Sequence, residues 1–288
     1  MLASPSSDSA CFDLVREVER GAPHNLEAAR SSIATGIDGR ADDSLPGFVG
    51  SAPCVQRLST MVRLVAQRDT TVLLTGESGT GKDLVANAIH QLSPRRHKPF
   101  VVINCAAIPE PLLEAELFGF VKGALTGAMQ SRVGRIHVAQ GGTLFLDEIG
   151  DFPLGLQAKL LRFAEQGEVQ RLGSTDTLRV DVRVIAATNV NLRKLVQERG
   201  FREDLFYRLS VFPIDLPPLR ERMSDLNSLI QAFLTKFCPH NVVLSPEAAD
   251  VLSHHTWPGN VREVRNVVER ASILVGAGRE IRPQHIVI

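Results

Sequence analysis

The chain has 288 residues, of which 44% are hydrophobic, and this is enough for one α/β domain with a sizeable core and a small second domain. Its 32 basic and 32 acidic residues give a formal net charge of +0, which argues against a broad nucleic-acid-binding face and leaves a local patch open. Its four cysteines are far apart and form no C-x2-C pair, so we interpret them as reduced thiols of a cytoplasmic protein and not as a disulfide framework or a zinc site. No apolar run is long enough to span a membrane, and the N-terminus lacks the pattern of a signal peptide.

The first part of the chain, residues 1–44, is rich in Ser, Ala and Asp and has weak hydrophobic periodicity. We therefore expect a flexible N-terminal arm, in which residues 12–20 have the pattern of a short amphipathic helix. Organised sequence begins near Leu45, and a helix is predicted over residues 55–68. We expect residues 45–215 to form the α/β core.

The stretch from Val72 to Asp83 reads as a buried strand, a glycine-rich turn and the start of a helix. This is the context that a phosphate-binding loop requires, because its glycines let backbone N–H groups turn toward phosphate oxygens. Lys82 would add a full positive charge beside the β- and γ-phosphates. The Ser or Thr that usually follows this lysine is replaced by Asp83. From this stretch alone, a glycine-rich turn that binds no ligand remains an alternative.

Three further strands are predicted, over residues 100–103, 143–146 and 182–187, and polar side chains follow each of them. Strands joined through helices predict a parallel sheet, whose carboxyl edge is where α/β proteins bind ligands. At that edge Asp147 could hold Mg²⁺ and Glu148 could polarise an attacking water. A solvated turn is the alternative for this acidic pair when it is considered alone.

The polar residues that follow the other two strands have supporting roles in this interpretation. We expect Asn104 to hydrogen-bond Glu148 and hold it away from water, and Thr188 and Asn189 to orient the γ-phosphate or the attacking water. Each of the three, considered alone, is equally well explained as an ordinary polar residue at a strand end.

Three arginines are candidates for contacts with developing negative charge. Arg202 and Arg208 are six positions apart and would lie on different faces of a helix, from which either could reach a neighbouring subunit. Surface ion pairs with Glu203 and Asp204 are the alternative. Arg262 falls in the first turn of a predicted helix, an unfavourable place for a cation unless an anion docks there.

A different pattern begins at Phe212, where Pro213, Pro217 and Pro218 indicate a linker. Helices are predicted over residues 225–237, 246–254 and 261–274, with a helix start at Ser245. We therefore expect residues 216–288 to form a small all-helical lid without a helix-turn-helix.

Taken together, the motifs occur in an order that resembles the AAA+ domain of sigma-54-dependent transcriptional activators, the bacterial enhancer-binding proteins. The likeness covers about residues 45–288. The segments that carry it are residues 76–83, 104–107, 123–128, 141–149, 201–209, 216–222 and 257–263. It implies an AAA+ P-loop NTPase fold, with a parallel sheet sandwiched by helices and a helical lid. It also implies Mg²⁺-dependent ATP hydrolysis in a ring, expected to be a hexamer, that remodels the sigma-54 RNA polymerase holoenzyme.

The resemblance also implies roles for individual residues. Lys82 would bind phosphates, Asp147 magnesium and Glu148 the attacking water, while Asn104 would couple Glu148 to a surface loop. Arg202 and Arg208 would act on the nucleotide of a neighbouring subunit, and Arg262 would sense nucleotide from the lid. The residues assigned to the nucleotide are Val49, Gly50, Gly76, Glu77, Ser78, Gly79, Thr80, Gly81, Lys82, Asp83, Ala139, Gly141, Gly142 and Arg262.

A surface loop is expected to contact the sigma factor, and it is made of Gly123, Ala124, Leu125, Thr126, Gly127 and Ala128. The family usually has Phe at its third position, where this chain has Leu125. The smaller side chain without a ring predicts a weaker or altered contact with the sigma factor.

Two other functions remain open from the sequence. One is a regulatory subunit that binds nucleotide and a partner and hydrolyses little ATP, and the other is an AAA+ remodeller of some other protein. The 123–128 loop argues against the second. We expect no receiver-like domain before the ATPase, a two-component-like regulator in the cytoplasm, and DNA contact through a missing domain or a partner subunit.

Overall fold

The computed structural model describes residues 44–124, 130–238, 240, 242–276 and 278–288. Residues from Ser44 to Ile288 form one compact unit. The predicted arm with its helix over residues 12–20 lies outside the described residues, as do positions 125–128 of the predicted sigma-contacting loop.

A five-stranded sheet organises this unit, and every neighbouring pair of its strands is parallel. Its strands lie in the order β2 (Phe100–Asn104), β5 (Thr143–Asp147), β8 (Arg183–Thr188), β1 (Val72–Thr75) and β9 (Phe212–Asp215). The four strands predicted from apolar runs are confirmed, to within a residue at most ends. They are short and apolar because both faces of a parallel sheet are covered.

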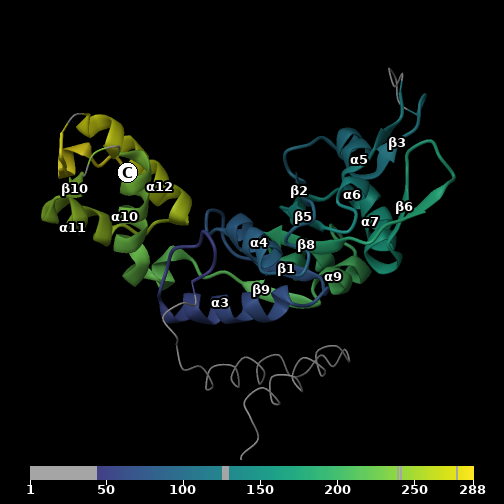
Figure 1. The fold of residues 1–288 in the computed structure, drawn as a ribbon, viewed down its shortest axis with the longest axis horizontal. Coiled ribbons are helices and arrows are strands. Elements are labelled where there is room, and N and C mark those ends of the chain that lie inside the picture. The colour runs from purple at the N-terminus through teal and green to yellow at the C-terminus, as the bar shows by residue number, and fades with distance from the viewer. Residues whose placement is uncertain (1–43, 125–129, 239, 241, 277) are drawn as a thin grey trace, which may run out of the picture. The chain divides into compact units, whose positions relative to one another are not determined.

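Side chains of the sheet alternate between two apolar cores. Val72 and Leu74 of β1 belong to the core that also contains side chains of α3 (Pro53–Ala66) and α4 (Lys82–Gln91), whereas Leu73 between them belongs to the core on the other face. Phe145 of β5 and its neighbour Leu144 divide in the same way. Helices α7 (Leu154–Gln166) and α9 (Glu203–Leu209), labelled in Figure 1, contribute side chains to this second core. This period of two is what a sheet buried on both faces requires.

The helix predicted over residues 55–68 is confirmed as α3, which begins and ends two residues earlier. Seven helices in the described residues flank the sheet or connect its strands. They are α3 (Pro53–Ala66), α4 (Lys82–Gln91), α5 (Glu110–Phe118), α6 (Arg135–Val138), α7 (Leu154–Gln166), α8 (Leu192–Gln197) and α9 (Glu203–Leu209). Two antiparallel pairs of short strands project from the core: β3 (Gly119–Phe120) with β4 (Arg132–Val133), and β6 (Glu168–Gln170) with β7 (Thr177–Arg179). The short 3-10 helix η1 (Ile149–Asp151) follows β5.

The C-terminal part is a helical lid with its own apolar core, in which Trp257 is buried. Its helices are α10 (Leu226–Phe237), α11 (Pro246–His254) and α12 (Asn260–Val275), with the 3-10 helices η2 (Leu219–Glu221), η3 (Met223–Asp225) and η4 (Pro283–His285). The predicted start at Ser245 is confirmed, since its hydroxyl accepts a hydrogen bond from the Ala248 N–H at 3.2 Å.

Two expectations about this region were wrong. The stretch from Phe212 is not simply a linker, because residues Phe212–Asp215 form the edge strand β9 beside β1. The N–H groups of Phe212 and Leu216 donate to carbonyl oxygens of Thr71 and Thr75, on the side of β1. Pro213 lies at the alternate position, where a backbone N–H would point away from the sheet, so its lack of an N–H costs no hydrogen bond between the strands. The lid is also not all-helical, since β10 (Val243–Leu244) pairs in parallel with β11 (Glu280–Ile281).

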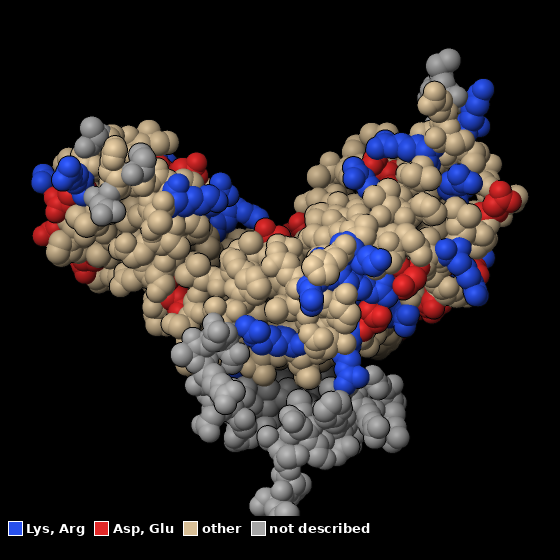
Figure 2. All heavy atoms as spheres, in the orientation of Figure 1, with Lys and Arg blue, Asp and Glu red and all other residues tan. Residues whose placement is uncertain are grey.

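Positive and negative side chains are interspersed over the face seen in Figure 2, in keeping with the formal net charge of +0. Within the described residues, no helix combines the length and the apolar character needed to cross a bilayer.

Candidate functional site

The turn between β1 and α4, residues 76–81, has the backbone that its glycines permit. Gly79 and Gly81 have φ of 80° and 101°, in the left-handed region that side chains with a β-carbon rarely adopt. A β-carbon at Gly79 would also lie 2.3 Å from the Gly259 carbonyl oxygen, so no larger residue fits there without displacing the lid. Gly81 occupies the N-cap position of α4, and the turn therefore leads into a helix N-terminus.

Lys82 is the first residue of α4 and is only 6% exposed. Its ammonium donates to the carbonyl oxygens of Gly76 at 2.9 Å and Glu77 at 3.3 Å, and it lies 4.0 Å from Oε1 of Glu148. Burial lowers the pKa of Lys82, and the nearby carboxylates of Glu148 and Asp147 oppose that shift. A buried cation whose hydrogen-bond acceptors are neutral carbonyls is well suited to receive an anionic ligand.

Asp147 ends β5, and Glu148 follows it in a left-handed conformation with φ 51° and ψ 51°. That backbone is uncommon for a residue with a β-carbon and concentrates at functional positions. Oε2 of Glu148 accepts a hydrogen bond from the Asn189 N–H at 3.3 Å. Glu148 is thereby held between the end of β8 and Lys82.

The expected contact between Asn104 and Glu148 is not present. The Asn104 amide instead donates to Oδ2 of Asp147 at 3.2 Å, and its carbonyl oxygen accepts from the N–H groups of Ala106 and Ala107. The reason is register: Asn104 lies directly opposite Asp147 in the parallel pair of β2 and β5. Asn104 therefore orients the first member of the acidic pair.

Asp147 suits a hydrated divalent cation. Burial raises the pKa of its carboxyl group, against the opposing effect of Lys82, so a bound cation would compensate for lost hydration. In the described part of the chain, no group of three or more His, Cys, Asp or Glu side chains converges on a metal-sized site. A single carboxylate with water and phosphate oxygens is the donor set that Mg²⁺ commonly uses.

Thr188 ends β8 in register with Thr75, so it lies on the same sheet edge as the glycine turn. Its side chain is buried, and its hydroxyl oxygen accepts from the Val190 N–H at 3.2 Å. Asn189 contributes its backbone N–H to Glu148, a role that its side chain could not reveal from sequence.

The arginines occupy three different settings. Arg202 precedes α9 and forms an ion pair with Asp204 at 2.7 Å, as the surface alternative predicts. Arg208 lies within α9 and donates to the Ala164 carbonyl oxygen at 2.8 Å. Of these three arginines, Arg262 is the one that contacts the glycine turn, donating to the Ser78 hydroxyl at 2.6 Å.

The other predicted nucleotide contacts do not all gather at this edge. Ala139, Gly141 and Gly142 precede β5, at the opposite end of the strand from Asp147, and the Gly142 carbonyl accepts from Arg183 at the start of β8. They are separated from the turn because they precede the start of β5, whereas the turn follows the end of β1. In a parallel sheet the starts and the ends of the strands lie at opposite edges. Gly50 lies against Asp225, whose Oδ1 accepts from the N–H groups of Ser51 and Ala52, and Val49 is partly exposed beside it.

Sequence reasoning missed the contacts through which the lid meets the glycine turn. The Gly79 carbonyl oxygen accepts from the first-turn N–H groups of α12, at 3.0 Å from Val261 and 3.3 Å from Arg262. The Glu77 carboxylate accepts from Arg220 and Asn260. The motifs that contain these residues, 216–222 and 257–263, were the only signal available, and they did not indicate a partner.

Residues 48–215 match the family described as the sigma-54 interaction domain, and residues 220–287 match the AAA+ ATPase lid domain. The chain belongs to the sigma-54 interaction domain family. Its fold is that of an AAA+ P-loop NTPase, with a parallel sheet flanked by helices and a C-terminal helical lid. The fold expected from the resemblance is confirmed.

Curated relatives of this family member are transcription regulators. The Nif-specific regulatory protein of Azorhizobium caulinodans is 50% identical over 258 residues, which cover 87% of this chain and 42% of the relative. The DNA-binding transcriptional activator HyfR of Escherichia coli is 55% identical over 231 residues, or 79% of this chain and 34% of the relative. The chain thus spans less than half of the length of these relatives.

Among solved structures, NtrX from Brucella abortus in complex with ATP is similar to this chain. The two share 33% sequence identity with a TM-score of 0.76, over 100% of this chain and 61% of NtrX.

Proposed function

We propose that this chain is the ATP-hydrolysing module of a sigma-54-dependent transcriptional activator, and that it remodels the sigma-54 RNA polymerase holoenzyme to allow open-complex formation. The observation that carries the proposal is the meeting of Lys82 and Glu148 at the carboxyl edge of the sheet, with Asp147 beside them. Membership of the sigma-54 interaction domain family supports sigma-54 as the proposed partner. The ATP complex of the similar protein NtrX supports ATP as the proposed nucleotide.

In the proposed mechanism the backbone N–H groups of residues 78–82 and the N-terminus of α4 bind the β- and γ-phosphates. The Lys82 ammonium turns from the carbonyl oxygens of Gly76 and Glu77 to the phosphate oxygens, since an anion is a stronger partner than a carbonyl. Glu148, held by the Asn189 N–H, then polarises the water that attacks the γ-phosphorus in line.

Asp147 would hold a magnesium ion, through water, with Asn104 fixing the orientation of its carboxylate. Magnesium supplies neutralisation of the charge on the β- and γ-phosphate oxygens when it is bound. Arg262 lies near enough to the turn to exchange its bond with Ser78 for a phosphate oxygen.

Arg202 and Arg208 are proposed to act on the nucleotide of a neighbouring copy in a ring, expected to be a hexamer. Both lie on or next to α9, on the surface of the core, and each has a partner that it can exchange: Asp204 for Arg202 and the Ala164 carbonyl for Arg208. A guanidinium delivered in this way would stabilise charge that develops in the transition state.

The proposal is tested by ATPase assays on assembled wild-type protein and on Glu148→Gln. We expect the substitution to lower kcat by about 100-fold or more, because the general base is lost, and to leave the affinity for ATP nearly unchanged. The matched control is Glu168→Gln on β6, which removes a carboxylate paired with Arg162 of α7 and should keep wild-type turnover. Equal turnover of wild type and Glu148→Gln would contradict the assigned role.

The partner is tested by retention of sigma-54 on immobilised protein, with and without a transition-state analogue of ATP hydrolysis. We expect retention only with the analogue, because the γ-phosphate state is proposed to set the position of the 123–128 loop. Assembled protein that hydrolyses ATP without retaining sigma-54 would favour a remodeller of another target.

A further inference from the structure

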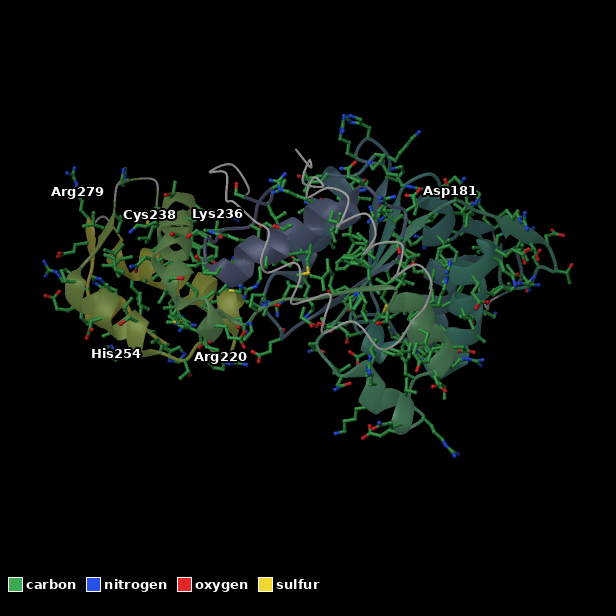
Figure 3. All side chains as sticks on the ribbon, turned by 90° about the horizontal axis from the view of Figure 1, so that it is seen from below. Asp181, Arg220, Lys236, Cys238, His254 and Arg279 are labelled. Atoms are coloured by element: carbon green, nitrogen blue, oxygen red, sulfur yellow. The ribbon has the colours of Figure 1, made fainter. Side chains whose placement is uncertain are left out.

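Among the contacts between the glycine turn and the lid, three side chains, Glu77, Arg220 and Asn260, share hydrogen bonds, and we call them the loop–lid junction. Arg220 donates twice to the Glu77 carboxylate, at 2.7 Å and 2.9 Å, and the Asn260 amide donates to the same carboxylate at 3.0 Å. The partners are 143 and 183 positions apart in the chain. Arg220, in η2, is labelled in Figure 3.

Asn260 is the buried member of this junction. It has 0% exposure and a φ of 55°, in the left-handed region that is uncommon for a residue with a β-carbon. Its amide nitrogen also donates to the Ser78 carbonyl oxygen at 3.1 Å, and its amide oxygen accepts from the Leu219 N–H at 2.8 Å. A buried polar residue with a left-handed backbone that bonds both to the turn and to Leu219 indicates a built structure and not a chance surface pairing.

The junction leads directly to the lysine of the site. The side chain of Glu77 is held by the lid, while its backbone carbonyl oxygen accepts from the Lys82 ammonium and from the Thr80 hydroxyl at 2.8 Å. A displacement of Glu77 therefore moves its backbone carbonyl oxygen. The Lys82 ammonium donates to this oxygen and must release it in order to bind phosphate. Conversely, a phosphate that rearranges residues 77–79 changes what the lid can contact.

We propose that the loop–lid junction couples phosphate binding at the glycine turn to docking of the lid, with Glu77, Arg220 and Asn260 as positioning residues. The inference rests on the proposed function, in that the turn must bind ATP. The coupling is reciprocal by thermodynamic linkage: lid contacts that favour the nucleotide-binding form of the turn are favoured by nucleotide to the same degree. Glu77 accordingly faces the lid and acts through the backbone, and not as a direct ligand of ATP.

The contribution of the exposed ion pair alone is expected to be small, since the Glu77 and Arg220 side chains are 44% and 54% exposed. The junction differs from an ordinary surface pair because the Glu77 carboxylate is shared with buried Asn260. A comparison pair is available on the lid: Arg282 donates to Glu280 at 2.8 Å, with side-chain exposures of 62% and 41%. This pair contacts neither the turn nor Asn260 and provides the matched control.

Tryptophan fluorescence can report on rearrangement of the lid. Trp257 is the only tryptophan, is 1% exposed, and lies three positions before Asn260 with its ring edge against His255. Its emission should change when the lid start rearranges.

The experiment titrates full-length wild type, Glu77→Gln, Arg220→Gln and the control Arg282→Gln with a fluorescent ATP analogue and, separately, with ATP while Trp257 emission is recorded. We expect the two junction variants to bind the analogue about tenfold more weakly and to show a reduced Trp257 response. The steady-state KM for ATP should rise with little change in kcat, since these residues position the turn and do not react. Arg282→Gln should match wild type in every measurement.

A second set of variants exchanges donor and acceptor. Asn260→Asp places a carboxylate against Glu77 and should weaken binding of the analogue, and adding Glu77→Gln to it should restore part of the affinity. That recovery would show direct coupling between the two side chains, because substitutions at independent positions have additive effects. Thermal unfolding without nucleotide identifies any variant that fails to fold.

Wild-type affinity and a wild-type Trp257 response in both Glu77→Gln and Arg220→Gln would overturn the inference and leave the proposed function intact. A folded wild type that binds no analogue would instead defeat the proposed function itself.

Discussion

Gly79 and Gly47 have nearly the same left-handed backbone, with φ of 80° and 74°, but different surroundings. A β-carbon at Gly47 meets nothing within 4 Å, whereas one at Gly79 would lie 2.3 Å from the Gly259 carbonyl oxygen and 2.9 Å from Cβ of Arg262. The pair therefore separates the cost of the backbone conformation from the cost of the close approach between turn and lid.

We predict that Gly79→Ala weakens ATP binding and lowers the melting temperature much more than Gly47→Ala. Both variants carry a left-handed alanine, which costs about 1 kcal/mol, but only Gly79→Ala also pushes the lid from the turn. Thermal unfolding and nucleotide titration of the two variants check this. Similar losses in both would mean that the lid is not held against Gly79 in solution.

The Glu77 carboxylate gives a pH dependence whose sign is set by its partners. Hydrogen bonds from Arg220, and then from Asn260, lower the pKa of Glu77 from 4.5 to about 2. A carboxylate with a lowered pKa stabilises the folded state above pH 4.5, and this contribution is lost as the pH falls toward 2. We predict that the difference in free energy of unfolding between wild type and Glu77→Gln is constant above pH 4.5 and shrinks below it. Denaturant titrations over a pH series measure this difference, and one that grows on acidification would contradict the assigned bonds.

Helix α7 shows how one element divides between core and surface. Leu160 faces the core with 0% exposure, whereas Leu154 at the start of the same helix is 53% exposed. We predict that Leu160→Ala lowers the free energy of unfolding by about 2–5 kcal/mol, because it removes buried methyl groups and leaves a cavity. Leu154→Ala should change it by about 0.5 kcal/mol or less. Urea unfolding of both variants is the measurement, and equal losses would place Leu160 outside the packed core.

Elements with an unambiguous hydrophobic period could be predicted from the sequence. The runs at 72–75 and 143–146 are apolar on consecutive positions because both faces of the sheet are buried there, and polar residues end them. The run at 100–103 is equally apolar, although it forms an edge strand in which Val102 is 51% exposed. The strand Phe212–Asp215 escaped prediction because Pro213 resembles a linker residue, and only an edge position tolerates it.

At the scale of the whole molecule, the sequence predicts those residues of the candidate site that lie at strand ends. It does not predict the contacts that depend on how distant segments pack together. Parallel strands bring the polar residues at 104, 147 and 188 to one edge whatever the loops between them do. Partners across that edge depend on register, which is why Asn104 bonds to Asp147 and not to Glu148. The bonds from Arg220 and Asn260 to Glu77 join segments far apart in the chain, and local periodicity carries no information about such pairs.

Pro213 has a consequence for how the protein behaves at high concentration. The outer border of β9 lacks an N–H donor at that position, since the neighbouring residues direct theirs inward to β1. A strand from another molecule that paired with this edge would lack one backbone hydrogen bond, because Pro213 has no N–H to donate. The border is therefore a poor template for fibril growth, and crowding in the cell should not convert this flank of the sheet into an aggregation seed.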